Sequence, residues 1–277
     1  MDNLEIDLAI SISEAQYASF IEGDFKNGLS LLGEAEFIND RIGVNEMTPN
    51  LYYLISSVYK YAGQAEKAIS YADRIFALEN LGTVDKARAH LAKGIALLDA
   101  KKLDSVAYHL NLAGTYFTQL SNTYSIITTY NTLGKYYLNV DQPEIAREYF
   151  SKLGPIIEQV EYSFGSPLYD SYFNIGQSYL KQNELDSARI FFEKCIHQGK
   201  VERDLDALIL YRTNKAYEAL SLLDQKENNY KQALEHYKTY KNYSDTLAKH
   251  TRNQALEELT IKYETREKEQ ELSLIHI

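Results

Sequence analysis

Histidine, cysteine and carboxylate side chains are the groups through which this chain could catalyse a reaction or bind a metal ion. The six histidines lie at positions 90, 109, 197, 236, 250 and 276, with no HExxH motif and no close pair of metal ligands. This spacing predicts packed or solvated histidines and no metal site. Walker, GxGxxG and GxSxG motifs are also missing from the sequence. We therefore expect a chain without enzyme activity, catalytic residues, cofactor or metal.

Composition narrows the class of protein further. The 277 residues carry a formal net charge of −10, which disfavours non-specific binding to nucleic acid. Only 4 prolines and 13 glycines occur, which favours long helices over a turn-rich β-structure. The single cysteine, Cys195, excludes an intramolecular disulfide framework and is expected to be a buried, inert thiol. No apolar run reaches 18 residues, and the first residues lack the features of a signal peptide.

An internal repeat organises the chain. Six segments share a short polar stretch followed by a small residue and then an aromatic residue or leucine; they begin at Gly23, Gly63, Lys101, Asp141, Asn183 and Asn228. Their small residues are Gly28, Ala68, Val106, Ala146, Ala188 and Ala233. Thirteen residues before each small residue lies a second landmark, clearest in LGKYY from Leu133 and IGQSY from Ile175. There an apolar residue, a glycine and a tyrosine occur at helical spacing.

This pattern resembles the tetratricopeptide repeat. The resemblance covers about residues 9–247 and implies antiparallel helix pairs, in which helix A carries the glycine and helix B the small residue. It implies an all-α, right-handed superhelix of about six helix pairs, residues 1–247, followed by a C-terminal capping helix, residues 248–277. The first and last copies lack the glycine, and the third has Lys93 and Val106 at landmark positions. Gly154-Pro155 should end one helix B, and Ser166-Pro167 should precede the next helix A.

The resemblance also implies a binding surface, because the A helices of such superhelices line a concave groove. Cations, asparagines and aromatic rings interleave on the face that the frame assigns to this groove, and such side chains can bind a peptide backbone, a carboxylate or apolar side chains. The alternative is that they are ordinary solvated residues of the A helices. The predicted groove residues are Tyr17, Asn50, Tyr53, Lys60, Tyr61, Arg88, Asn131, Lys135, Asn139, Phe173, Asn174, Gln177 and Lys181.

The last thirty residues follow a different pattern. An apolar seam at Leu256, Leu259 and Tyr263 could cover the last repeat, whereas Glu264–Glu271 is polar on every side. The run from Tyr243 to Leu272 is similar to the junction in bacterial regulators, especially those of Bacteroidetes, in which a periplasmic repeat array leads into a membrane segment and a cytoplasmic effector.

These resemblances imply a non-enzymatic scaffold that binds a peptide or protein segment, as the sensor domain of a bacterial signalling regulator. The compartment would be the periplasm, with membrane contact only through a segment absent from this chain. The alternative is a free-standing cytoplasmic adaptor or peptide-pheromone receptor. A second chain could pair with the C-terminal helix.

The loss of apolar periodicity after Tyr263 makes a testable prediction. Deleting residues 264–277 should leave the melting temperature nearly unchanged, because a short polar helix without packing partners is marginally stable in water. Hydrogen exchange should be slow up to about Tyr263 and fast beyond it. Unfolding of the sixth repeat on this deletion would show that the segment is a structural cap.

Overall fold

The fold is all-helical. The computed structural model describes residues 3–157, 167–201, 207–246 and 248, and no strand is present in these ranges. The chain divides into two compact units, residues 1–160 and 161–277, and each is described by itself. The all-α, tetratricopeptide-like helix pairs expected from the sequence are confirmed in both units. The predicted boundary between residues 247 and 248 stays a prediction.

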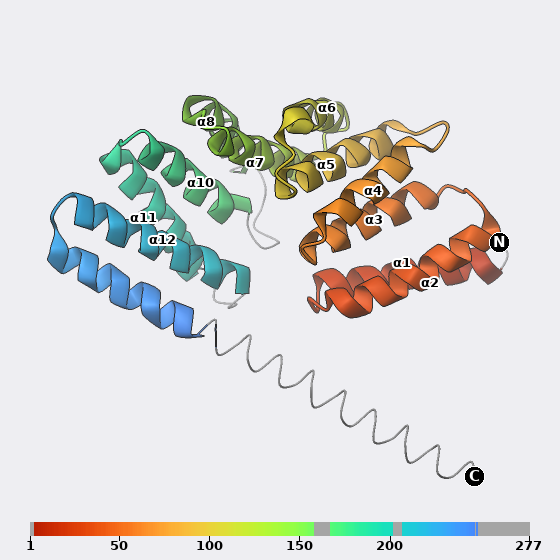
Figure 1. Ribbon diagram of the computed structural model, residues 1–277, viewed down its shortest axis with the longest axis horizontal. Helices are drawn as coiled ribbons and strands as arrows, with labels where there is room; N and C mark the ends of the chain where they lie inside the picture. The colour runs from red at the N-terminus through yellow and green to blue at the C-terminus, as the bar shows by residue number, and fades with distance from the viewer. Residues whose placement is uncertain (1–2, 158–166, 202–206, 247, 249–277) are drawn as a thin grey trace, which may run out of the picture. The chain divides into compact units, whose positions relative to one another are not determined.

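The first unit consists of four successive helix hairpins and a short ninth helix (Figure 1). In each hairpin helix A packs on the helix B that follows, and successive A helices also contact each other, α3 with α5 and α5 with α7. The helices are α1 (Asn3–Phe20), α2 (Phe25–Ile42), α3 (Thr48–Tyr61), α4 (Ala65–Phe76), α5 (Thr83–Asp99), the 3-10 turn η1 (Leu103–Ser105), α6 (Val106–Gln119), α7 (Thr123–Asn139), α8 (Pro143–Ser151) and α9 (Leu153–Ile157).

The second unit repeats the same arrangement. Helix α10 (Pro167–Lys181) packs on α11 (Leu185–Val201), which in turn packs on α12 (Ala207–Lys226). A further helix over residues 230–246 forms the B helix of the last pair. It is tied to α12 by a hydrogen bond from Asn214 Nδ2 to Ser244 Oγ at 3.0 Å, and by stacking of Tyr217 on Tyr243.

Each A helix ends in the same kind of turn. One residue in every A–B turn has a positive φ, and these six residues are Gly23, Gly63, Lys101, Asp141, Asn183 and Asn228. They are the first residues of the six repeat segments in the sequence. In five of the six turns the next N–H donates to the carbonyl five positions back, as from Gln64 to Tyr59 at 2.8 Å. This is the long-range bond of a Schellman motif, which stops a helix and reverses the chain.

In the third, fourth and fifth repeats the two helices of a hairpin cross where helix A carries a glycine, which has no side chain. A Cβ atom built on Gly134 would lie 2.3 Å from Cε1 and Cζ of Phe150, and one on Gly176 would lie 2.7 Å from Cε1 of Phe192. The small residues Ala146 and Ala188 are fully buried, as the repeat frame predicts. The nearest atoms to the two glycines, however, belong to the phenylalanine four residues after each alanine.

Where helix A carries serine in place of this glycine, a hydrogen bond between the two helices replaces the packing of a ring against the glycine. Ser56 Oγ donates to the carbonyl of Ala68 at 2.7 Å, and Ser221 Oγ donates to the carbonyl of Ala233 at 2.9 Å. Both serines are buried, and both acceptors are the small landmark residues of helix B. The second and sixth repeats thus join their helices through a polar contact at the position where the fourth and fifth use ring packing.

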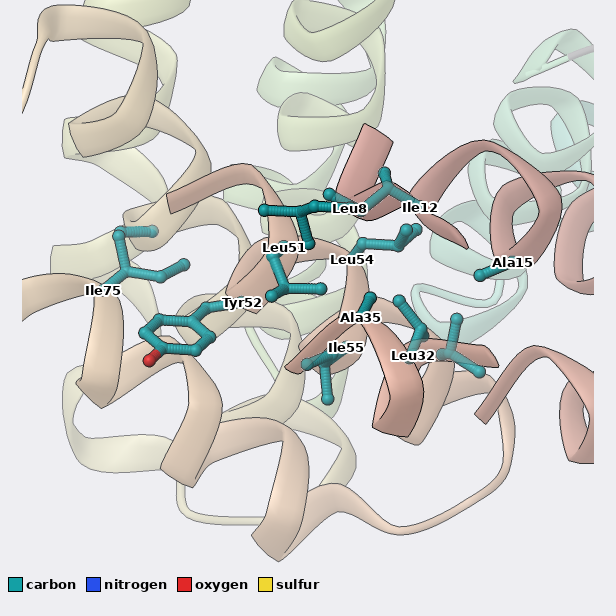
Figure 2. Close-up of a cluster of buried hydrophobic side chains, with 12 residues drawn as sticks. Leu8, Ile12, Ala15, Leu32, Ala35, Leu51, Tyr52, Leu54, Ile55 and Ile75 are labelled. Carbon is teal, nitrogen blue, oxygen red and sulfur yellow. The ribbon is translucent and has the colours of Figure 1, made fainter. Parts of the chain in front are cut away.

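The core at the N-terminal end is assembled from side chains of five helices, α1 to α5 (Figure 2). Leu8 and Ile12 of α1 contact the same cluster as Leu32 of α2, Leu51 of α3 and Ile75 of α4. All five side chains are at most 6% exposed, so each contributes roughly 1.5–3 kcal/mol by leaving water. Adjacent hairpins therefore share one core instead of each burying its own.

Two predicted helix boundaries can be compared with the structure. Helix α10 begins at Pro167, as expected from Ser166-Pro167. Helix α8 already ends at Ser151, and Gly154-Pro155 lies inside the short α9, so the expectation that Gly154-Pro155 ends helix B was wrong. Proline fits there because it is compatible with the first turn of a helix. The seam at Leu256, Leu259 and Tyr263 lies outside the described residues.

Replacing Gly134 by alanine should lower the free energy of unfolding by about 1–3 kcal/mol, because the ring of Phe150 is 1% exposed and has no room to move. Gly33→Ala in α2 is the matched control: its Cβ would meet no atom within 4 Å, so the helix should gain about 0.5–1 kcal/mol. Urea denaturation monitored by circular dichroism measures both. Equal effects of the two substitutions would contradict the crossing at Gly134.

Candidate functional site

Three of the predicted groove residues meet near the N-terminal ends of α3 and α5. Arg88 Nη1 of α5 donates a hydrogen bond to Asn50 Oδ1 of α3 at 3.1 Å. The same guanidinium lies 5.6 Å from the ring centroid of Tyr53. All three side chains are partly exposed, and they come from two adjacent A helices. We call Asn50, Tyr53 and Arg88 the Arg88 cluster.

Burial keeps the tyrosine of the Arg88 cluster neutral. Burial raises the pKa of Tyr53 above its ordinary value of 10.0, and the positive charge of Arg88 offsets part of that rise. The hydroxyls of Tyr61 and Tyr124 add to the rise, so these rings lie within electrostatic reach of Tyr53. At neutral pH Tyr53 therefore presents an O–H group beside a permanent cation.

Charged residues of both signs gather at the other ends of the A helices. Burial raises the pKa of Asp99 at the end of α5, while the nearby charges of Lys60 on α3 and Lys135 on α7 lower it. The Lys60 ammonium also lies 3.8 Å from the ring centroid of Tyr61. Asp99 was not among the predicted groove residues. It occupies in the third repeat the position that Tyr61 and Asn139 hold in the second and fourth, so the repeat frame could have identified it.

Two aromatic residues of the first unit that were predicted to line the groove lie apart from the Arg88 cluster. Tyr17 is 57% exposed and lines a separate groove of about 500 Å³ between α1 and α2, together with Glu14 and Asn27. Tyr61 is also largely exposed, but it stacks on Phe25 with ring centroids 5.7 Å apart. The structure therefore does not bring Tyr17 together with the Arg88 cluster, and it gives Tyr61 a packing role.

The three predicted residues of α7 differ in exposure. Asn131 is only 6% exposed, Lys135 is partly exposed and Asn139 at the helix end is exposed. A buried asparagine can contact a ligand only if neighbouring side chains move. Lys135 and Asn139 are thus the more accessible members of this set.

In the second unit the predicted residues of α10 divide between core and surface. Phe173 packs on the buried Phe192 with ring centroids 5.7 Å apart, so it belongs to the core. Gln177 is partly exposed and Lys181 is exposed. Asn174 is 6% exposed, and among the described residues its Nδ2 finds no hydrogen-bond partner. An unsatisfied buried donor is costly, so the environment of Asn174 favours an added acceptor.

Two of the histidines, expected from the sequence to be packed or solvated side chains, contact each other in the fold. Nδ1 of His90 on α5 and Nδ1 of His109 on α6 are 2.9 Å apart. The residues are 19 positions apart in the sequence, and folding of one helix hairpin brings them together. In the described residues no group of three histidine, cysteine or acidic side chains could hold a metal ion.

A second ionic cluster has a structural role. Asp224 of α12 is fully buried, and its oxygens accept from Arg189 Nη2 at 2.6 Å and from His236 Nδ1 at 2.7 Å. Glu227 also pairs with Arg189, at 2.7 Å. In the second, fourth and fifth repeats the position of Asp224 holds a tyrosine that stacks on an aromatic ring of helix B twelve residues later, as Tyr137 does on Tyr149. The aspartate–histidine contact of the sixth repeat replaces that stacked pair.

Cys195 is fully buried in the core of the second unit, as predicted. Over the described ranges, no helix is both long and apolar enough to cross a membrane.

Comparison with known proteins supports this fold. Residues 169–196 match the tetratricopeptide repeat family, while a comparison with curated proteins finds no match. The quorum sensor NprR from B. thuringiensis is 14% identical, with a TM-score of 0.59 over 86% of this chain and 76% of that chain. Pseudomonas aeruginosa pilF is 14% identical, with a TM-score of 0.58 over 90% of this chain and 100% of that chain.

A Rap protein complexed with competence and sporulation factor is also similar. It is 16% identical, with a TM-score of 0.60 over 88% of this chain and 76% of that chain. At such identities the likeness shows the fold, which is that of tetratricopeptide-like helix pairs.

The buried position of Asp224 leads to a prediction about stability. Arg189→Met should lower the free energy of unfolding of the second unit by about 3–5 kcal/mol, because it leaves a buried carboxylate without its guanidinium. The double variant Arg189→Met/Asp224→Leu should recover most of this loss, since apolar residues can replace a buried ion pair. Lys238→Met, which removes an exposed pair with Glu235, is the control and should change little. Equal effects of Arg189→Met and Lys238→Met in urea denaturation would refute this account.

Proposed function

We propose that this chain is a non-enzymatic scaffold that binds an extended peptide segment along the exposed faces of its A helices. The observation that carries the proposal is the Arg88 cluster, in which a cation, an amide and a neutral tyrosine meet across α3 and α5. Contact across two adjacent A helices is what a ligand running along several repeats requires. A binding role also agrees with the absence of recognisable catalytic motifs in the sequence.

Each member of the Arg88 cluster offers a different contact. A guanidinium has five N–H donors in a planar fork, which suits a carboxylate or a row of peptide carbonyls. The Asn50 side chain has both a donor and an acceptor, so it can match one peptide unit. The ring of Tyr53 provides an apolar wall, and its hydroxyl can donate to a carbonyl.

The ends of the A helices add selectivity by charge. Lys60 and Lys135 lie within electrostatic reach of Asp99, so this region can receive groups of either sign. Because Arg88 is a cation, we expect a peptide with at least one acidic group near the Arg88 cluster. In the second unit, a backbone carbonyl close to Asn174 would satisfy its Nδ2, which finds no partner in the part of the chain that the structure describes.

The structural neighbours are consistent with this role. One of them is complexed with competence and sporulation factor, and another is a quorum sensor. Their likeness to this chain is one of fold, so the proposal depends on the residues of this chain and takes from the neighbours only a precedent on the same scaffold.

For the biological context, we propose the sensor part of a bacterial signalling regulator. In this view the array acts in the periplasm, and ligand-driven changes in the repeats pass to residues 248–277. The alternative is a free-standing cytoplasmic adaptor or peptide-pheromone receptor. The coding sequence on either side of residues 1–277 discriminates between them, because only the first arrangement requires a leader and a membrane segment.

The test of binding begins with a peptide array probed with the full chain, with selected peptides then measured by isothermal titration calorimetry. Arg88→Gln should weaken binding of the best acidic peptide about 10-fold or more, because a hydrogen bond to a charged group is worth roughly 1.5–3 kcal/mol. Lys86→Gln, an exposed residue two positions away on α5, is the matched control and should leave affinity unchanged. Lys135→Glu should also weaken binding with little effect on stability.

Raising the salt concentration should weaken the same complex, because the charges of partly exposed groups are screened within about 8–10 Å at physiological ionic strength. Affinity that is insensitive to Arg88→Gln, to Lys135→Glu and to salt would refute the assignment of the Arg88 cluster. Failure of every peptide on the array to bind would refute the proposed function.

A further inference from the structure

His90 and His109 are placed so that one proton can be shared between their rings. The two Nδ1 atoms are 2.9 Å apart, and the ring centroids are 5.1 Å apart. The centroids are thus only 2.2 Å farther apart than the nitrogens, so each Nδ1 lies close to the line between the rings. A hydrogen bond in this arrangement requires one imidazole to donate and the other to accept. The neutral pair must therefore combine two different tautomers.

The same geometry disfavours a metal ion between the rings. Two ligands of one metal direct their lone pairs at a common point, whereas these nitrogens point at each other. Lys93, which interacts electrostatically with both histidines, adds positive charge to the site. The pair is therefore suited to a proton and not to a divalent cation.

Packing and charge around the pair oppose its protonation. Phe76 of α4 packs edge-on against His90 at 4.8 Å between centroids, and Tyr108 of α6 packs edge-on against His109 at 5.2 Å. The charged groups that act on the pair are Lys93 of α5 and Asp73 of α4, and these two form an ion pair with each other. From α6, Tyr116 stacks on His90 with centroids 6.0 Å apart. The acidic side chain near the pair is thus already engaged by a lysine.

We propose that the His90–His109 pair makes the packing of α5 on α6 dependent on pH, so that the third hairpin is closed near neutrality and loosens in mild acid. The first added proton can still be shared between the rings. A second proton leaves two imidazolium groups facing each other across the helices, and the hydrogen bond is lost. The helices then separate at this point, because two like charges without an acceptor repel each other.

The sign of the effect follows from the direction of the pKa changes. Burial, then the charge of His109, then Lys93 lower the pKa of His90 from 6.5 to about 4. Burial and Lys93 also lower the pKa of His109, against the raising effect of Asp73. In the unfolded chain both groups bind protons near pH 6.5, so the folded state holds fewer protons below that pH. The stabilisation is complete above about pH 6.5 and is lost as the pH falls toward about 4.

Loosening would extend beyond the pair, because α5 also contacts α3 and α7. Arg88 precedes His90 by two residues on the same helix, and its bond to Asn50 depends on the position of α5 against α3. The inference itself concerns helix packing, and it stands whether or not the chain binds a peptide.

Nitrogen-detected NMR of the full chain tests the geometry directly. At pH 7.5 one of the two imidazoles should carry its proton on Nδ1 and the other on Nε2. Both should titrate below the ordinary histidine pKa of 6.5, with the lower midpoint near pH 4. Two identical tautomers, or two midpoints at or above pH 6.5, would overturn the proposal.

Hydrogen exchange at pH 7.5 and 5.0, corrected for intrinsic rates, tests the consequence. Residues 83–119 should lose more protection at pH 5.0 than residues 5–42 of the same chain. The double variant His90→Gln/His109→Gln cannot titrate and should remove this difference. Its melting temperature should fall less between the two pH values than that of the wild type, by at least about 2 °C.

His197→Gln, at an exposed position of α11, is the control and should behave as the wild type does. If the double variant is too unstable to study, His109→Gln alone still removes the repulsion between two imidazolium groups. The proposal would be overturned if the double variant and His109→Gln lost as much hydrogen-exchange protection at pH 5.0 as the wild type does.

Discussion

The close crossing of helices A and B within one hairpin is the interaction on which the rest of the structure depends. An A helix must end abruptly and reverse before helix B can return along it, and a residue with positive φ provides this in all six turns. Two of these residues are glycines, three are asparagine or aspartate, and one is Lys101. A lysine in this conformation costs roughly 1–2 kcal/mol, which shows how strongly packing of the hairpin determines the backbone there. Contacts between repeats then build on hairpins that are already in place.

The sequence predicts the regular part of this structure well. The six repeat segments begin at the six left-handed residues, and the small residue in each is buried, because backbone reversal and close crossing leave strong local signals. The third repeat follows this rule despite Lys93 and Val106: its turn is left-handed at Lys101, and Val106 is fully buried. An atypical residue at one landmark position therefore does not change the register of the repeat.

Exposure and pairing of individual side chains were harder to predict, because they depend on neighbours far along the chain. Asn131 and Phe173 occupy groove positions in the frame, yet the first is buried and the second packs on Phe192. The contact between His90 and His109 requires the rotation of two helices about their axes, which repeat spacing alone does not specify. Asp99 holds the position equivalent to Tyr61 and Asn139, but in the sequence a single carboxylate on a helix is indistinguishable from an ordinary solvated acid.

Glycine and serine solve the same packing problem in ways that are not interchangeable. Gly134 matches the ring of Phe150, whereas Ser56 matches the carbonyl of Ala68 in a hairpin whose residue equivalent to that phenylalanine is Ala72. Transplanting one helix between these repeats would set a hydroxymethyl group against a ring, or leave a void beside a glycine. The smallest piece of this chain that evolution or an engineer can duplicate, delete or shuffle intact is therefore the whole hairpin.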